Sequence, residues 1–261
     1  METKLLTEHD PLPYELSNSE GSSNCLVICD HASNAVPKNL NQLGLTDETL
    51  RKHIGIDIGT EEIGRYLSQK LNATMIKANY SRLVIDLNRG PEHEGSILAV
   101  SDHIAIPRNQ NLSPADRQHR VDEIYRPYHK KIEALLKAIR DRGQNPFIIS
   151  VHSFTPIMDG FNRPWHIGLL WGGDATVPQT VIQNLRAHNP DFVIGDNEPY
   201  SIQEDKRYNN TIEVHAEGNN IPSIIPEFRQ DMVSTPKDAL KMAQIFLASL
   251  EPVINDPKIY K

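Results

Sequence analysis

Short apolar runs alternate with longer amphipathic segments along most of the chain. Apolar runs of about four to eight residues that are bounded by turn formers predict buried strands. Segments whose apolar residues recur at intervals of about three or four are typical of helices with one buried face. We expect strands or short extended runs at residues 26–29, 74–77, 83–87, 147–151, 166–171, 192–195 and 223–228, and helices at 60–71, 113–141, 177–187 and from 235 to just before Pro252. This alternation favours a three-layer α/β fold, with helices flanking a mostly parallel or mixed central sheet.

The start of the longest expected helix has a clear local signal. Ser113 followed by Pro114 is typical of an N-cap and a first helical residue. Pro127 falls inside the same helical pattern, so we expect the helix to kink or split there, because proline has no N–H to donate. Residues 1–24 are polar and are expected to form an N-terminal arm, whereas residues 25–261 show no linker and are expected to form a single domain.

Composition narrows the class of partner. The 261 residues include 27 basic and 34 acidic side chains, for a net charge of −7. This balance disfavours a nucleic-acid or anionic-membrane partner. The sequence has no run of about 18 apolar residues that would span a bilayer and no signal-peptide pattern at its start. Cys25 and Cys29 are expected to be reduced core thiols, which agrees with a cytoplasmic location.

Polar residues follow the ends of several expected strands. His31, Asn88 with Arg89, and His152 each come at the end of an apolar run, and Glu227 lies in the last one. In a parallel sheet the carboxyl ends of the strands meet in one crevice, where α/β proteins bind their ligands. The sequence therefore predicts a site at this edge of the sheet.

The residue types at this edge are those of a catalytic metal site. A catalytic zinc takes about three His or carboxylate ligands and keeps one position for water, whose pKa it lowers. His31 and His152 are candidate ligands, with Asn34 or Asp57 as the third. Asp57 lies among apolar residues just before a helix, where it is otherwise explained as a turn or capping acid. Asp30 is a candidate for orienting His31 from behind.

The remaining candidates concern proton transfer and substrate binding. Glu227 is the candidate general base, and Arg89 has the planar fork that suits a substrate carboxylate. His215 is expected either to polarise a carbonyl or bind substrate, or to be structural. Arg82 either binds a carboxylate or pairs with Asp86. Arg229 is either a second anion clamp or a partner for Asp231.

Several longer motifs resemble the N-formylglutamate amidohydrolase family. They are CDHASN at 29–34, YSRLVIDLNR at 80–89, VHSFTP at 151–156, RPWHIG at 163–168, GDNEPY at 195–200 and IEVHAE at 212–217, and they occur in order over most of the chain. The resemblance implies a fold similar to zinc carboxypeptidases and hydrolysis of an N-formyl amide to formate and an amino acid. The substrate would be a small acidic acyl amino acid, and residues 25–261 would form the catalytic domain.

The resemblance also assigns roles by matching motif. It implies that His31 and His152 bind one divalent metal, expected to be zinc. Asn88 with Arg89 resembles the pair that holds the substrate carboxylate, and Glu227 resembles the late catalytic glutamate. Asn34 departs from the pattern, since the wider fold has glutamate there, and this strengthens Asp57 as a ligand.

Two other classes of function remain as alternatives. Asn34 in place of an acid motivates a non-catalytic binding or regulatory protein that keeps the fold and the crevice. A serine hydrolase using Ser33 or Ser153 is disfavoured, because the chain has no Gly-x-Ser-x-Gly motif. Neither a Gly-x-Gly-x-x-Gly motif nor a Walker loop is present to support nucleotide binding.

Overall fold

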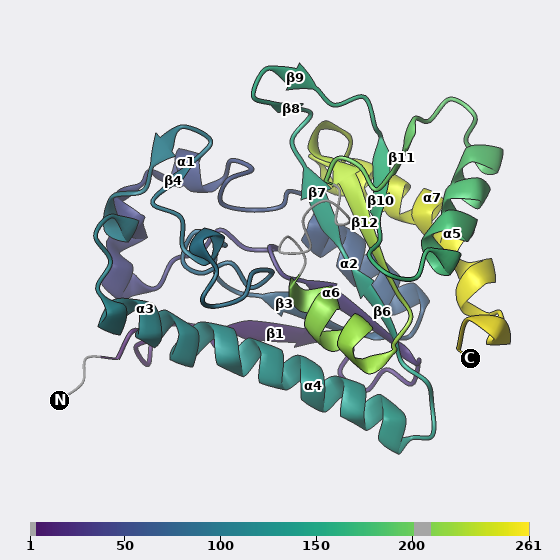
Figure 1. Cartoon of the computed structure of the whole chain (residues 1–261), viewed down its shortest axis with the longest axis horizontal. Helices are drawn as coiled ribbons and strands as arrows, with labels where there is room; N and C mark the ends of the chain where they lie inside the picture. The colour runs from purple at the N-terminus through teal and green to yellow at the C-terminus, as the bar shows by residue number, and fades with distance from the viewer. Residues whose placement is uncertain (1–3, 201–209, 261) are drawn as a thin grey trace.

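A central eight-stranded sheet forms the middle layer of the protein (Figure 1). The structure, a computed structural model, describes residues 4–200 and 210–260. The strand order is β1-β3-β2-β6-β12-β10-β11, with β7 paired to β12. The bounds are β1 Tyr14–Ser17, β2 Cys25–Cys29, β3 Thr74–Ala78, β6 Phe147–Ser150, β7 His152–Phe154, β10 Ile167–Leu170, β11 Ile194–Asp196 and β12 Ser223–Arg229. The three-layer α/β prediction is confirmed.

The sheet is mixed, with a parallel centre. Strands β3, β2, β6 and β12 run parallel to their neighbours in this order, and β7 is also parallel to β12. Antiparallel pairing occurs between β1 and β3 and between β12 and β10. The parallel centre brings the carboxyl ends of β2, β6 and β12 to one edge, where the candidate side chains were expected.

Helices cover both faces of the sheet. Alternate residues of β2 enter different cores, as the period of two in a strand requires. Leu26 and Ile28 pack in the core on the side of α4, whereas Val27 packs in the core formed with α2, α5 and α7. The bounds are α1 Asp47–Leu50, α2 Thr60–Lys70, α3 Pro114–Arg120, α4 Arg126–Asp141, α5 Thr176–His188, α6 Asn210–His215 and α7 Pro236–Ile254. Short 3-10 helices lie at Lys38–Gly44, Glu94–Ser96, Pro107–Asn109, Glu217–Asn219, Gln230–Met232 and Pro257–Tyr260.

The long helix is interrupted by a π-helical turn just before Pro127, the position where a kink or a split was expected. Ser113 caps α3 by accepting a hydrogen bond from the Asp116 N–H, and α4 begins at Arg126, one residue before the proline. A π-helical turn, Val121–Tyr125, joins the two segments. The wider turn accommodates a position at which an α-helical hydrogen bond is missing.

Other expectations about elements are wrong. Residues 83–87 form buried turns, not a strand, because their carbonyls are bonded by side chains from elsewhere: Asn109 Nδ2 donates to Leu83 and Arg120 donates to Val84. The last helix continues through Pro252 to Ile254, since a proline in the final turn removes few hydrogen bonds. Part of the expected N-terminal arm forms β1, which extends the sheet beside β3.

Two small hairpins complete the described part of the chain. One pairs β4 (Val100–Ser101) with β5 (Ile104–Ala105), and the other pairs β8 (Ile157–Met158) with β9 (Phe161–Asn162). Their tips approach each other, with His103 Nε2 lying 3.5 Å from Asp159 Oδ1. In Figure 1, β4 and the β8–β9 hairpin both lie in the upper part of the molecule.

Candidate metal centre and active-site pocket

Three buried side chains, His31, Asp57 and His152, converge at the carboxyl edge of the sheet, each offering one ligand atom within 4.8 Å of the others. His31 follows β2 by two residues, and His152 is the first residue of β7. Asp57 comes from the loop before α2, and its N–H donates to the His31 carbonyl at 2.9 Å. The strands and this backbone bond therefore determine where the three side chains meet.

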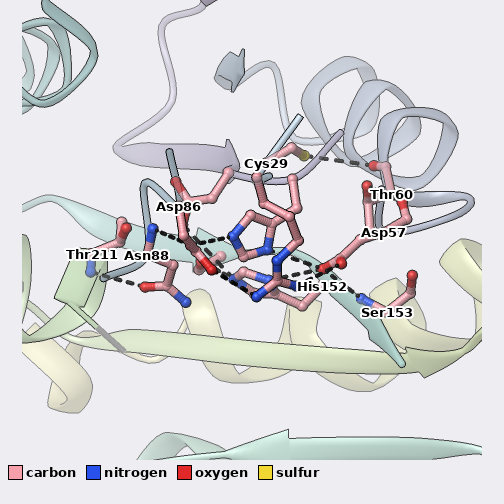
Figure 2. A network of polar contacts seen from close by, with 12 residues as sticks. Cys29, Asp57, Thr60, Asp86, Asn88, His152, Ser153 and Thr211 are labelled. Carbon is pink, nitrogen blue, oxygen red and sulfur yellow. Dashed lines mark hydrogen bonds and ion pairs between the residues drawn. The ribbon is translucent and has the colours of Figure 1, made fainter. Parts of the chain in front are cut away.

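The contacts among these three side chains fit a tetrahedral metal. Nδ1 of His31 lies 3.3 Å from Asp57 Oδ2, and Nδ1 of His152 lies 3.2 Å from the same oxygen. Zinc bonds of about 2.0–2.1 Å in tetrahedral geometry separate neighbouring ligand atoms by about 3.3–3.4 Å. Figure 2 shows Asp57 beside His152, with the Ser153 backbone nitrogen also directed at its carboxylate.

The far nitrogens of both imidazoles are held by other side chains. His31 Nε2 lies 2.7 Å from Asp86 Oδ1, and His152 Nε2 lies 3.1 Å from Ser150 Oγ. Histidines that bind metals usually have such a partner on the other ring nitrogen, which orients the ring. The three grouped side chains, and the partners that orient the two imidazoles, thus suit one divalent cation.

Two expectations about the neighbours of His31 need correction. Asn34 lines a neighbouring groove, which Asp57 also borders, and not the pocket that contains His31. Asp57 is the acid that is grouped with both histidines. Asp30 does not orient His31. Its Oδ1 accepts a hydrogen bond from Tyr128 at 2.8 Å and its Oδ2 lies 3.9 Å from His152.

Arg82 links the two carboxylates of the site. It lies 3.2 Å from Asp57 and 2.8 Å from Asp86, so the ion-pair interpretation of this arginine is the one that the contacts show. Burial would raise the pKa of Asp57, but His31, His152 and Arg82 hold it well below its ordinary value. Burial likewise opposes a charged Asp86, yet Arg82 and His31 lower its pKa.

The pKa of His31 is raised, whereas those of Asp57 and Asp86 are lowered. Burial and the nearby Arg82 disfavour its protonation, but the carboxylates of Asp86 and Asp57 outweigh them and raise its pKa to about 9. The site therefore favours positive charge at the position where both Nδ1 atoms face Asp57.

Glu227 lies beside this group on β12. It is aligned with His152 across the parallel β7–β12 pair. It is buried, and its Oε2 accepts no hydrogen bond from the described part of the chain. Burial raises the pKa of its carboxyl to about 7. A carboxyl with these properties can both accept and release a proton near neutral pH.

These residues line a pocket of about 230 Å³. Asn88 and Arg89 lie on its wall. Asn88 is fixed from behind, because its Oδ1 accepts a hydrogen bond from the Thr211 N–H at 3.0 Å, as Figure 2 also shows. The loop at 91–111 contributes Gly95, Leu98 and Ser101 to the lining.

Two sequence candidates lie outside the pocket lining. His215 is buried in α6, and its Nε2 lies 2.8 Å from His129 Nδ1. Arg229 Nε donates to Asp231 at 2.8 Å, so the partner interpretation holds for it. Residues 212–215 are helical and not the end of a strand, which is why His215 is not directed to the carboxyl edge.

The sequence interpretation named Asp30 as the support of His31 and named no support for His152. Asp86 orients His31, and Ser150 does the same for His152. Asp86 carried a usable signal, because it is an acid within an apolar run, as Asp57 is. Ser150 carried none, since serine is common at strand ends.

The fold and the site define the protein as a three-layer α/β chain with a candidate metal centre, and beside it a buried glutamate, at the carboxyl edge of its sheet. A sequence model described as N-formylglutamate amidohydrolase matches residues 23–234. The chain belongs to the N-formylglutamate amidohydrolase family, and this membership implies an amidohydrolase.

Solved structures agree with this fold. A gene product from Agrobacterium tumefaciens is 26% identical with a TM-score of 0.90, covering 97% of this chain and 100% of that one. The N-formylglutamate amidohydrolase from Ralstonia eutropha is 19% identical with a TM-score of 0.66, covering 94% and 99%. The second likeness concerns the fold alone. No curated protein matches the sequence, and no helix in the described ranges is long and apolar enough to cross a bilayer.

Proposed function

We propose that this protein is a metal-dependent amidohydrolase that cleaves an N-acyl amino acid, with an N-formyl amino acid such as N-formylglutamate as the first candidate. The observation that supports it is the convergence of His31, Asp57 and His152 in one pocket with Glu227, whose buried Oε2 has no hydrogen-bond partner among the described residues. In the reaction the amide C–N bond breaks, a water oxygen bonds to the acyl carbon, and the amine nitrogen gains a proton.

His31, Asp57 and His152 would hold the metal. A bound divalent ion such as zinc supplies polarisation of the amide carbonyl and a lowered pKa of water. Asp86 and Ser150 keep the two imidazoles in the orientation that directs Nδ1 toward Asp57. Arg82 keeps Asp57 and Asp86 ionised.

Glu227 acts as the proton carrier. Its carboxylate accepts a proton from the attacking water and gives it to the leaving amine nitrogen, so the residue ends the cycle as it began. Its burial beside His152 in register places it within the same pocket as the ligands.

Asn88 and Arg89 bind the substrate. The Arg89 guanidinium suits the α-carboxylate of the amino acid, and its Nη1 donates to the Asn88 carbonyl at 2.9 Å. His215 and Arg229 take no part in this mechanism, because they lie outside the pocket lining.

The test combines metal content with formate release. Purified protein should contain about one divalent metal per chain and release formate from N-formyl amino acids, and a chelator should abolish this release. His152→Ala should lose both metal and activity, with Arg229→Ala as a control that keeps both. Absence of chelator-sensitive formate release from metal-loaded protein would overturn the proposal. The non-catalytic alternative rested on Asn34, and it loses support because Asp57 supplies the acid.

A further inference from the structure

The proposed substrate-binding pair, Asn88 and Arg89, lies in a turn that follows Asp86 and has no helix or strand of its own. Leu87 and Asn88 are both buried in this turn. The backbone groups of a buried turn need hydrogen-bond partners from elsewhere in the fold. The position of the binding pair therefore depends on the groups that bind the turn.

One side of the turn is bound to the candidate metal centre. The Asn88 N–H donates to Asp86 Oδ1 at 2.9 Å, and the same oxygen lies 2.7 Å from Nε2 of His31. Figure 2 shows Asp86 beside Asn88. The turn thus starts from the carboxylate that orients one of the proposed metal ligands.

The other side of the turn is bound by the start of α6. The Thr211 N–H donates to Asn88 Oδ1 at 3.0 Å, and the Asn210 N–H donates to the Asn88 carbonyl at 3.3 Å. The first N–H groups of a helix have no partners within the helix, so they are available for such contacts. Arg89 Nη1 donates to the same carbonyl at 2.9 Å. A shift of α6 would therefore move both Asn88 and Arg89.

A pair of buried histidines joins the end of α6 to the same turn. His215 is one helical turn after Thr211, so the two buried side chains project from one face of α6. His215 Nε2 lies 2.8 Å from Nδ1 of His129 on α4, and His129 Nε2 lies 3.0 Å from the Leu87 carbonyl. The contacts close a loop, because α6 binds Asn88 directly at its start and Leu87 through two imidazoles at its end.

Hydrogen-bond chemistry fixes the direction of this chain of contacts. A carbonyl oxygen only accepts, so Nε2 of His129 carries the hydrogen that it shares with Leu87. Burial lowers the pKa of His129, and in a neutral imidazole the other nitrogen is then an acceptor. Nδ1 of His129 therefore accepts a hydrogen bond from Nε2 of His215. The donation from His215 holds His129 in the tautomer that donates to the turn.

We infer that His129 and His215 are positioning residues for substrate binding, which hold the turn that places Asn88 and Arg89 on the pocket wall. Neither histidine is among the described residues that line the pocket, whereas Asn88 and Arg89 are. The inference rests on the proposed function, because it concerns the binding of the substrate α-carboxylate. A guanidinium binds a carboxylate best when its planar fork is aligned with both oxygens, so a small displacement of the turn weakens this contact.

The first experiment isolates the α-carboxylate by comparing two substrates with metal-loaded protein. N-formylglutamate carries this carboxylate, and N-formylisoglutamine has an amide in its place. His129→Phe should raise the KM of N-formylglutamate by at least about tenfold, with kcat changed less than about threefold. The KM of N-formylisoglutamine should stay within about threefold of its wild-type value, because this substrate has no α-carboxylate for Arg89.

The outcomes separate the inference from the proposed function. An equal loss for both substrates would mean that His129→Phe acts on the fold or on the metal and not on the α-carboxylate. Unchanged kinetics would mean that the histidine pair has no role in binding. Either result overturns the inference and leaves the proposed function standing, whereas no formate from either substrate with the wild type overturns both.

A second variant tests the pair from its other member. His215→Phe removes the N–H that holds His129 in one tautomer. The preference for N-formylglutamate over N-formylisoglutamine, as a ratio of kcat/KM values, should fall by about threefold or more. An unchanged preference in folded His215→Phe protein would also overturn the inference.

Two controls guard against a general loss of structure. His129→Gln keeps an N–H donor for the Leu87 carbonyl, so the KM of N-formylglutamate should return to within about threefold of the wild-type value. A KM as high as that of His129→Phe would contradict the inference. His166→Phe is the matched control, because Nδ1 of this half-buried histidine accepts from the Val193 N–H at 2.8 Å, outside the described pocket lining. It should leave the preference unchanged, and a loss equal to that of His129→Phe would overturn the inference.

Discussion

At the residue scale, one carboxylate oxygen organises the site. Asp57 Oδ2 faces Nδ1 of His31, Nδ1 of His152 and the Ser153 N–H. The other oxygen of the same carboxylate pairs with Arg82. Both oxygens of Asp57 are thus used, which explains why its pKa lies far below the ordinary value in spite of burial.

Glu227→Gln tests the proton carrier. The amide keeps the shape of the side chain but cannot accept the proton of water, so turnover should fall by about 100-fold to 10,000-fold. Metal content should stay the same, because Glu227 is not one of the three grouped ligands. Elemental analysis together with formate release checks both parts. Loss of metal from the variant would instead make Glu227 a ligand.

Asp86→Asn tests the support of His31. The amide no longer provides a charged partner for Nε2, so metal affinity should fall by about tenfold to a hundredfold. Competition with a chromogenic chelator measures the affinity. Asp122→Asn is the control, since Asp122 pairs with Arg126 on the surface. Equal affinities in the wild type and Asp86→Asn would contradict the assigned role.

At the element scale, helices α4 and α6 contact each other, and α4 contacts the loop that follows β3 and leads into the pocket. His129 of α4 lies between His215 of α6 and the Leu87 carbonyl, with its two ring nitrogens 2.8 and 3.0 Å from them. The next residues after Leu87 are Asn88 and Arg89. The histidine pair therefore links two helices to the segment that is proposed to bind substrate.

This pair should make stability depend on pH. Burial and the neighbouring His129 lower the pKa of His215 from 6.5 to about 4, so between these values the unfolded chain binds a proton that the folded chain does not. The stability that depends on keeping His215 neutral in the folded protein is therefore fully present above pH 6.5 and is lost as the pH falls toward 4. It amounts to roughly 3 kcal/mol in the free energy of unfolding.

Urea unfolding at several pH values, with the wild type and His215→Gln, measures this contribution. The wild type should lose stability more steeply than the variant below pH 6.5. The difference between the two proteins isolates the pair from other titrating groups. Parallel curves over this range would refute the assignment.

At the scale of the whole molecule, the candidate metal centre joins parts of the chain that are otherwise distant. His31 and Asp57 are 26 positions apart in sequence, and Asp57 and His152 are 95 apart. A ligand that binds only the folded chain stabilises it by mass action. Metal binding should therefore stabilise the whole fold and not only the pocket.

Thermal unfolding with zinc or with a chelator tests this expectation. Zinc at about 1,000 times its dissociation constant contributes about 4 kcal/mol, which corresponds to a rise in Tm of about 10 °C for a chain of this size. His152→Ala should show no zinc-dependent rise. A rise of equal size in this variant would mean that zinc binds elsewhere.

Local patterns predicted much of the fold. The apolar run Leu26–Cys29 and the last strand both appear in the sheet, because a buried strand needs little more than its own composition. The Ser113 cap and the Pro127 interruption were also correct, since both depend on backbone chemistry within one turn. The strand predicted at residues 83–87 was wrong, because side chains of Asn109 and Arg120, from distant segments, donate hydrogen bonds to backbone carbonyls there.

The sequence by itself determined which residue types stand at the ends of the strands, and therefore that His31 and His152 reach one edge of a sheet. It did not determine which acid joins them. Asp57 meets both imidazoles, and Asn34 does not, because of the loop path before α2 and the hydrogen bond from the Asp57 N–H to the His31 carbonyl. Such contacts depend on strand order and loop geometry, which are properties of the folded chain and not of any local pattern.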